Sequence, residues 1–385
     1  MIDQGTLENT LAAATARGGE FAEIFVEDRQ SSGALLDDNR IEELSSGRSR
    51  GAGIRVLVGE STGFAHTADL TERGLLEAAK AAADAARDGN GGVRTVDLSS
   101  QHVDSPSPVQ IMPETVAKQR KVELLELANG AARQVGDSIA QVSVGYGDVR
   151  RRIQIANSDG LLAGDDQVKT RFSVSCVALG DTGMQTGRES IGHSMGFELF
   201  DQYDVTDLAV KAANRAITKL SARPAPSGAV TTVIGKGGGG VLFHEACGHG
   251  LEADHVAKQA TVFAGRVGEL VASPLVTVID DGTMPHEWGA FAIDDEGKPA
   301  QRNVLIEDGI LLDFMWDELR ARAEGRPSSG NGRRQSYKYL PMVRMTNTYI
   351  ANGETDPEDI IADTDSGIYV AQLGGGQVNL SLIHI

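Results

Sequence analysis

Three of the chain's eight histidines fall within the twelve residues from His244 to His255. The first two enclose His244-Glu245-Ala-Cys-Gly-His249, which differs from the zinc-peptidase pattern HExxH by one additional residue. Neutral imidazole nitrogens bind zinc, and a glutamate beside a ligand can act as general base toward a metal-bound water. The motif HExxxH therefore predicts a zinc site at His244 and His249, with Glu245 as the catalytic residue.

The additional residue decides which backbone such a site needs. Residues in an α-helix turn by about 100° each, so histidines five apart point about 140° away from each other on a straight helix. A π-bulge would realign them, and Gly248 would ease that distortion. We therefore expect a deformed helix with converging imidazoles. On a regular helix, the same histidines would be ordinary core or surface groups.

A catalytic zinc needs a third protein ligand. The candidates are acidic residues and histidines, three of them nearby and three distant: Glu252, Asp254 and His255, and Asp280, Asp281 and His286. The sequence does not choose among them. Cys247 is expected to point away from the histidine face and to be a small buried residue.

Two further segments have residue types that suit a binding site. Asn331, Arg333 and Arg334 lie in a glycine-rich loop and are predicted to bind substrate, because paired arginines hold carboxylates well. A solvated loop is the alternative. Residues 293–297 form an acidic turn, which is either a calcium site or a hairpin tip. The glycine run at 235–240 lacks the order of a phosphate-binding loop, which disfavours nucleotide binding.

The composition of the 385 residues excludes several other classes of protein. Lys and Arg number 36 against 54 Asp and Glu, so the net charge is −18 and the general surface has no attraction for nucleic acid or anionic membrane. No apolar run approaches the roughly 20 residues that span a bilayer, and the N-terminus lacks the pattern of a secretory signal. With only Cys176 and Cys247, a disulfide framework is excluded and a reducing, cytoplasmic compartment is expected.

The elements that must position these residues predict an α+β fold. We expect N-terminal α/β domains with antiparallel sheets and helices, followed by a β-rich catalytic domain that carries the HExxxH helix. The expected parts are an N-terminal domain at 1–90, a linker at 91–113, a central domain at 114–222 and a metallopeptidase domain at 226–385.

Local patterns predict the main elements of the first two parts. A turn is expected at Asp37–Arg40, and a helix capped by Asp69 is expected to continue through Leu75–Arg87. Two further helices are predicted at Thr115–Val135 and Asp204–Ser221. Strands are predicted at Glu20–Glu27, Ala34–Leu36, Ile41–Leu44, Gly53–Val58, Ile139–Tyr146, Arg151–Asn157 and Thr170–Leu179.

Longer sequence blocks around these residues resemble the TldD/PmbA peptidase family. They are HEACGHGLEAD, VFAGRVGELVAS, VTVIDDGT, IDDEGKPAQRNVLIEDG, SGNGRRQSY, MTNTYI and GGGQV, in that order and mostly between Gly235 and Val378. With its intact HExxxH motif, the chain resembles the TldD subunits of the family, because the TldE (PmbA) partner subunits generally lack this motif.

The resemblance implies a cytoplasmic zinc metalloprotease that pairs with a TldE-type subunit and cleaves unstructured peptides or small unfolded proteins, including leader-peptide trimming. It implies metal ligation by His244 and His249, acid/base catalysis by Glu245, and a third ligand that is a cysteine far beyond GGGQV. The chain ends at Ile385 with SLIHI, which does not resemble the family. We therefore expect a C-terminally truncated chain with an incomplete site. The alternative is a non-catalytic peptide-binding or scaffold subunit of the same complex.

Overall fold

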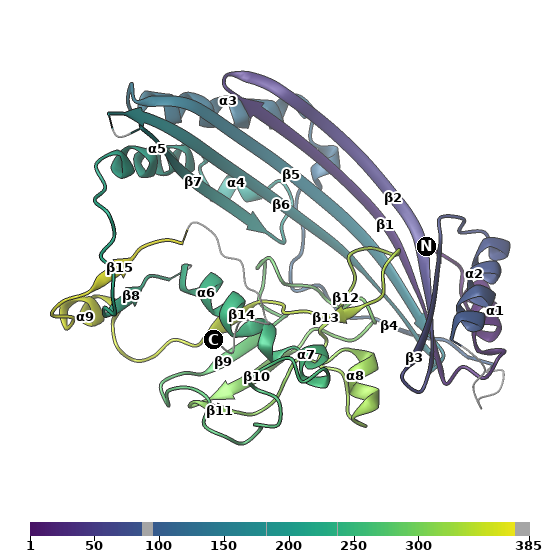
Figure 1. Ribbon diagram of the computed structural model, residues 1–385. Helices are drawn as coiled ribbons and strands as arrows, with labels where there is room; N and C mark the ends of the chain where they lie inside the picture. The colour runs from purple at the N-terminus through teal and green to yellow at the C-terminus, as the bar shows by residue number, and fades with distance from the viewer. Residues whose placement is uncertain (87–94, 182, 237, 374–385) are drawn as a thin grey trace.

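The computed structural model describes residues 1–86, 95–181, 183–236 and 238–373 and confirms the α+β fold (Figure 1). Its helices are α1 (Gln4–Thr15), α2 (Glu72–Ala85), α3 (Lys118–Gln134), α4 (Leu199–Gln202), α5 (Val205–Leu220), α6 (Gly238–Ala246), α7 (Ala253–Ala257), α8 (Glu318–Ala323) and α9 (Pro357–Ala362), with 3₁₀ turns at Pro113–Thr115 and Gly248–Leu251. None of the described helices is long and apolar enough to cross a membrane.

A large antiparallel sheet forms the upper layer in Figure 1. Its strands are β1 (Phe21–Asp37), β2 (Arg40–Val58), β3 (Ser61–Thr67), β4 (Ser99–Gln101), β5 (Ile139–Asn157), β6 (Leu161–Gly180) and β7 (Gly183–His193). The order is β3-β2-β1-β5-β6-β4, with β7 also on β6 and with β4 running parallel to β6. Because β1 pairs with β5, the two expected N-terminal domains share one sheet, and their boundaries stay a prediction.

The long strands correct the shorter ones that the sequence predicts. Glu20–Glu27 and Ala34–Leu36 belong to the single strand β1, and Ile139–Tyr146 and Arg151–Asn157 belong to β5. The polar residues between them keep their backbone pairing, because a ladder needs amide and carbonyl groups and not apolar side chains.

The predicted turn between β1 and β2 is confirmed, with Asp38 and Asn39 at φ 44° and 67°, whereas the predicted helix cap is wrong. Thr71 caps α2 by accepting from the Gly74 amide, and Asp69 accepts from the Thr71 amide instead.

Side-chain alternation gives the two faces of the large sheet different partners. On β1, even-numbered residues such as Ile24 pack with α1 and α2, and Leu36 packs with α3 and α5. The odd-numbered Phe25 packs against Ile293 and Tyr337 of the C-terminal part. The sheet therefore separates a helical layer from the C-terminal part, which lies below the sheet in Figure 1.

The C-terminal part is built from short elements around its own apolar core. Its strands are β8 (Thr232–Ile234), β9 (Val278–Asp281), β10 (Arg302–Glu307), β11 (Ile310–Leu311), β12 (Gly332–Arg333), β13 (Met342–Val343), β14 (Thr348–Ile350) and β15 (Ile368–Val370). A four-stranded sheet has the order β11-β10-β9-β14, while β12 pairs with β13 and β8 with β15. The GGGQV block, from residue 374, lies outside the described residues.

Candidate metal centre

A change of helix type brings His244 and His249 together. His244 lies in α6, which ends at Ala246, and His249 lies in the 3₁₀ turn that follows. The centres of the two imidazole rings are 4.8 Å apart, with the ring planes at 82°. The imidazoles converge without the π-bulge that the spacing suggested, because Cys247, at φ −125° and ψ −43°, interrupts the helix and the separate 3₁₀ turn after it redirects the second histidine.

Gly248 has a different role from the one the sequence suggested. A Cβ atom at this position would lie 2.4 Å from the sulfur of Met345, which belongs to the apolar core of the C-terminal part. Glycine is therefore needed because the backbone packs closely against the core, and not because it bends easily. This close packing fixes the turn that carries His249.

The opposite faces of α6 have different surroundings. Phe243 and Cys247 are partly buried against the core, and burial raises the pKa of the Cys247 thiol; the cysteine is therefore half-buried, not fully buried as the sequence predicted. His244 and Glu245 line an open depression of about 560 Å³, which we call the His244 depression. Its wall includes Glu287 and strand β14.

Glu252 orients His249. Its side chain is fully buried, and its Oε2 atom lies 3.2 Å from Nδ1 of His249. Backbone hydrogen bonds on both sides of Glu252, from Ala253 to the Met315 carbonyl and from Met315 to the Leu251 carbonyl, fix its position. With Nδ1 occupied, Nε2 of His249 is the nitrogen left for a metal, as in carboxylate–histidine–metal arrangements.

The two histidines have opposite pKa shifts. Burial and the nearby His249 lower the pKa of His244, whereas the hydrogen bond to Glu252 raises the pKa of His249. The lowered pKa keeps His244 neutral, which is the form that binds metal.

The six candidate third ligands fall into two groups. Glu252, Asp254 and His255 are the only three described residues of metal-binding type whose ligand atoms gather within 4.8 Å. The carboxylate of Asp280 accepts from Asn331, Thr346 and Thr348, and that of Asp281 accepts from Thr283. His286 bonds through its backbone to Ser107 and Ser194 of the central part.

The residues present fit part of a zinc site. Two converging imidazoles, one of them oriented by a buried carboxylate, match two of the four positions of a tetrahedral site. The second oxygen of Glu252, Oε1, is buried and has no hydrogen-bond partner among the described residues. The chain's two cysteines are Cys176 and Cys247, so the cysteine that the family resemblance implies beyond GGGQV is not among its residues.

The predicted substrate residues separate into two kinds. Asn331 and Arg334 are buried, which argues against substrate binding by these two, and the assignment stays a prediction. Asn331 is fully buried and donates to Asp280 at 2.7 Å and to the Arg344 carbonyl at 3.0 Å. Arg334 is buried in an ion pair with Glu23 of β1. Arg333 is half-buried and its side chain has no hydrogen bond or ion pair within the described ranges, so of the three it alone has a side chain free to bind a ligand.

The acidic turn at 293–297 is a buried turn between the two layers. Asp294 accepts amide hydrogens from Glu296, Lys298 and Gly332, and Asp295 pairs with Arg151 at 2.7 Å. Glu296 pairs with Arg55 of β2 at 2.7 Å. Each carboxylate is occupied by protein groups, which argues against a calcium site.

Comparison with known proteins identifies the family. Residues 22–86, 111–220 and 227–382 match the first, central and C-terminal domains of the PmbA/TldA metallopeptidases. The chain belongs to this family. The HExxxH residues lie in the segment that matches the C-terminal domain of the PmbA/TldA metallopeptidases.

Several PmbA/TldA relatives are similar over most of the chain. A metalloprotease TldD homolog of Haemophilus influenzae is 38% identical over 98% of the chain and 79% of its own length. A zinc metalloprotease TldD homolog of Saccharolobus solfataricus is 25% identical over 94% of the chain and 79% of its own length. The crystal structure of TldE from Thermococcus kodakarensis shares the fold, with a TM-score of 0.78, 24% identity, and coverage of 98% of this chain and 84% of that one.

Sequence reasoning missed the basic residues that this family member places near the metal centre. Arg29, Arg151 and Lys169 come from three strands of the large sheet and lie with Arg333 around one pocket. Their one signal was charge within long strands, such as the three arginines at 150–152, and it reveals a cluster only once the strand register is known.

Proposed function

We propose that the chain is a zinc-dependent peptidase that cleaves unstructured peptides or small unfolded proteins, including leader peptides, as the catalytic subunit of a TldD/TldE-type complex. The observation that carries this proposal is the convergence of His244 and His249, with His244 and Glu245 lining the open His244 depression. The name of the Saccharolobus solfataricus relative supports zinc, and the TldE-like fold supports a TldE-type partner.

The proposed location is the cytoplasm. Both cysteines are free thiols, as expected in a reducing compartment. The substrates suit that location as well, because unstructured peptides and small unfolded proteins can enter an open depression without first being unfolded.

The residues of the motif have distinct roles in this proposal. Zinc held by the two imidazoles would polarise the scissile carbonyl and lower the pKa of the attacking water. Glu245 takes a proton from that water and passes it to the leaving amine nitrogen. Glu252 keeps His249 in the tautomer and orientation that aim Nε2 at the metal.

The alternative is a non-catalytic peptide-binding or scaffold subunit of the same complex. It is favoured by one observation: no third ligand joins His244 and His249 among the residues that the structure describes. A subunit of that kind would bind peptides through the same surfaces without hydrolysing them, so catalysis by Glu245 distinguishes the two functions.

The test is Glu245→Gln, with Glu287→Gln as the matched control because Glu287 lines the same depression. With a TldE-type subunit present, hydrolysis of an unstructured peptide should fall by about 10²–10⁴-fold in Glu245→Gln, while its zinc content stays at the wild-type level. Glu287→Gln should stay within a few-fold of wild type. Equal activity in all three proteins would exclude Glu245 as the general base.

A further inference from the structure

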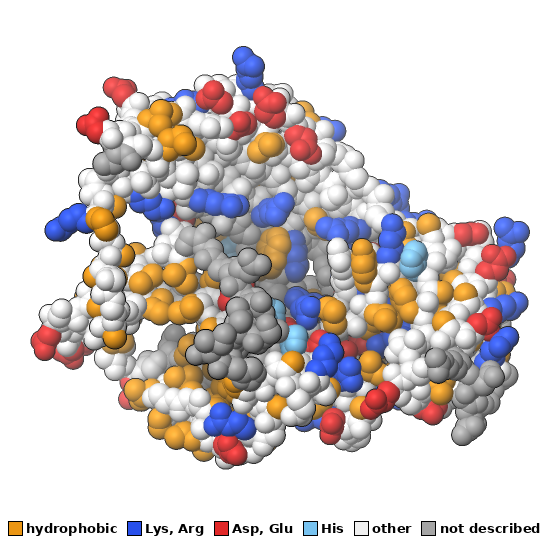
Figure 2. All heavy atoms as spheres, in the orientation of Figure 1, with side chains coloured by type: hydrophobic (Ala, Val, Ile, Leu, Met, Phe, Trp, Pro, Cys, Tyr) orange, Lys and Arg blue, Asp and Glu red, His pale blue; other side chains and the backbone are white. Residues whose placement is uncertain are grey.

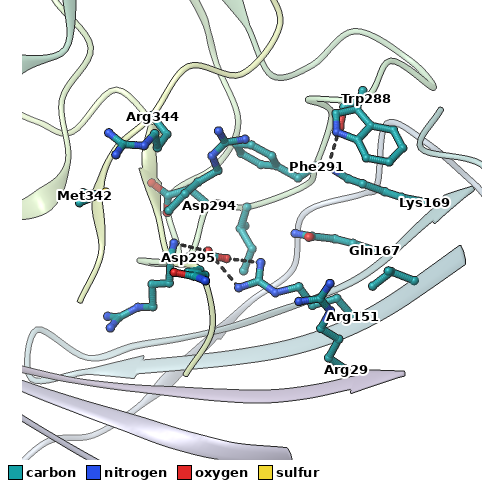
Figure 3. A pocket seen from close by; sticks show the side chains of 15 residues that line it. Arg29, Arg151, Gln167, Lys169, Trp288, Phe291, Asp294, Asp295, Met342 and Arg344 are labelled. Atoms are coloured by element: carbon teal, nitrogen blue, oxygen red, sulfur yellow. Dashed lines mark hydrogen bonds and ion pairs between the residues drawn. The ribbon is translucent and has the colours of Figure 1, made fainter. Parts of the chain in front are cut away.

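A pocket of about 500 Å³, which we call the cationic pocket, lies between the large sheet and the C-terminal part (Figure 3). Figure 2 shows Lys and Arg side chains gathered around the hollow beneath the sheet. Two carboxylates, Asp294 and Asp295, line the cationic pocket beside six basic side chains: Arg29, Arg151, Lys169, Arg333, Arg334 and Arg344. This excess of positive charge contrasts with the net charge of −18 of the whole chain.

The register of strands β1, β5 and β6 brings several of these basic side chains together. Arg29 of β1 lies directly opposite Arg151 of β5, and Arg151 lies opposite Gln167 of β6. Lys169 is two residues beyond Gln167 and therefore on the same face. Like charges directly opposite one another destabilise a sheet, so folding alone does not explain this placement.

Half of the six cations already have carboxylate partners. Arg151 pairs with Glu27 and Asp295, Arg334 with Glu23, and Arg344 with Glu252.

The other three cations have no carboxylate partner in the part of the chain that the structure describes. Arg29 and Arg333 make no ion pair there, and Lys169 donates only to the backbone carbonyl of Trp288, at 2.5 Å. Neither Asp295, which is held by Arg151, nor Asp294, which accepts backbone amides, neutralises them. The cationic pocket thus holds donors and positive charge that the protein itself does not use.

The environment of Lys169 agrees with a strong positive potential. Burial, followed by the charges of Arg333 and Arg151, lowers the pKa of Lys169 to about 8. A bound anion would offset this repulsion between cations.

The cationic pocket adjoins the metal centre through two residues. Arg344, on the pocket wall, lies 3.3 Å from the Glu252 carboxylate that orients His249. After burial and the nearby His249, the charge of Arg333 also contributes to the lowered pKa of His244. The cationic pocket and the two histidines are therefore neighbours, so one peptide can occupy both.

We propose that the cationic pocket binds a carboxylate of the peptide substrate through Arg333, Lys169 and Arg29, and so positions the scissile bond at His244 and Glu245. That the ligand is a peptide rests on the proposed function. The carboxylate belongs either to an aspartate or glutamate side chain or to the C-terminus, and both sources present the same planar, bidentate acceptor to a guanidinium.

The test measures binding apart from hydrolysis, in the Glu245→Gln background. Four fluorescent peptides of one length combine a Glu or a Gln side chain with a free or an amidated C-terminus, and fluorescence anisotropy gives their affinities. Arg333→Gln and Arg333→Glu are compared with Arg17→Gln, which removes an exposed arginine that pairs with Asp84 far from the pocket. The Arg333 side chain makes no hydrogen bond in the described chain, and its backbone pairing with Met342 is kept in the variants, so they should fold.

The expected result is that one carboxylate source improves affinity by roughly tenfold or more, as for charge-assisted hydrogen bonds. That preference should vanish in Arg333→Gln, should turn against the acidic peptides in Arg333→Glu, and should survive in Arg17→Gln. The side-chain and C-terminal arms show which carboxylate is bound. Equal affinity for all four peptides, or an unchanged preference in both Arg333 variants, would overturn the proposal.

The same experiment keeps this proposal separate from the proposed function. The carboxylate preference could depend on Arg333 while the protein with Glu245 intact cleaves no peptide. That result would support ligand binding in the cationic pocket and overturn the proposed peptidase activity. Cleavage of peptides by the protein with Glu245 intact, without any carboxylate preference, would support the peptidase activity and overturn the proposal for the cationic pocket.

Discussion

Arg334 and Arg333 are neighbours in the sequence and both line the cationic pocket, yet their charged groups serve two regions of opposite character. Arg334 enters a buried network in which it pairs with Glu23, while Arg55 donates to both Glu23 and Glu296. Arg333 turns into the cationic pocket, where Arg29 and Lys169 also lack carboxylate partners among the described residues. Both regions lie between the large sheet and the C-terminal part.

The difference separates charges that hold the layers together from charges that are left for a ligand. A buried charge is tolerated when it is paired and hydrogen-bonded. The network around Glu23 is paired by Arg55 and Arg334, while the Nε atoms of both arginines are buried without a hydrogen-bond partner among the described residues. Cations crowded together without carboxylate partners cost stability, which a bound anion would offset. The same residue type therefore stabilises the interface in one region and is proposed to recognise substrate in the other.

Among the variants that test this difference, Arg334→Gln should have the largest effect, a loss of stability. It leaves Glu23 buried with Arg55 as its remaining partner, so the free energy of unfolding should fall by about 3 kcal/mol, the lower end of the range for broken buried pairs. Urea unfolding followed by circular dichroism measures the change. The matched variant is Arg333→Gln, whose free energy of unfolding should stay within about 0.5 kcal/mol of wild type. Equal losses in the two variants would remove the distinction between the regions.

A smaller effect should appear with pH, through Lys169. Its pKa is lowered to about 8, so Lys169 loses its positive charge as the pH rises from 7 to 9. Carboxylate peptides remain ionised throughout, and their affinity for the Glu245→Gln protein should therefore fall several-fold over this range. Anisotropy titrations at a series of pH values measure the decline.

Lys169→Gln is the control for that pH profile, because other charged groups surround the lysine. Arg151 on β5, Asp165 on β6, and Arg333 and Asp295 on the C-terminal part all contribute to its environment. Asp294 on the pocket wall has a pKa raised to about 7 by burial, and Arg334 has a pKa lowered to about 9 by burial. If Lys169→Gln shows the same decline as wild type, one of these other groups causes it.

The sequence predicted local features well. The turn at Asp37–Arg40, the α+β class and the interruption of the helix around HExxxH all follow from residue types within a few positions of each other. Strand lengths were underestimated because backbone pairing continues through polar residues.

Features that depend on distant partners could not be predicted. Whether an arginine forms an ion pair depends on residues hundreds of positions away in the sequence. Glu23, for example, is the partner of Arg334. The cationic pocket joins residues 29, 151, 169 and 333, which only the register of β1, β5 and β6 and the docking of the C-terminal part bring together. For the same reason, the sequence offered six third-ligand candidates without choosing one.

Metal binding at His244 and His249 is the property on which the proposed catalysis depends. The structure offers one competing cluster in the described chain, Glu252 with Asp254 and His255, so the most direct measurement compares His249→Ala with His255→Ala. Zinc affinity is measured by competition with a chromophoric chelator, alongside peptide hydrolysis. We predict that His249→Ala weakens zinc binding by more than about 100-fold and abolishes hydrolysis, because loss of a ligand costs more than loss of a residue that orients one. His255→Ala should retain both properties. The opposite result, with zinc lost from His255→Ala and kept by His249→Ala, would place the metal in the acidic cluster and contradict the assignment.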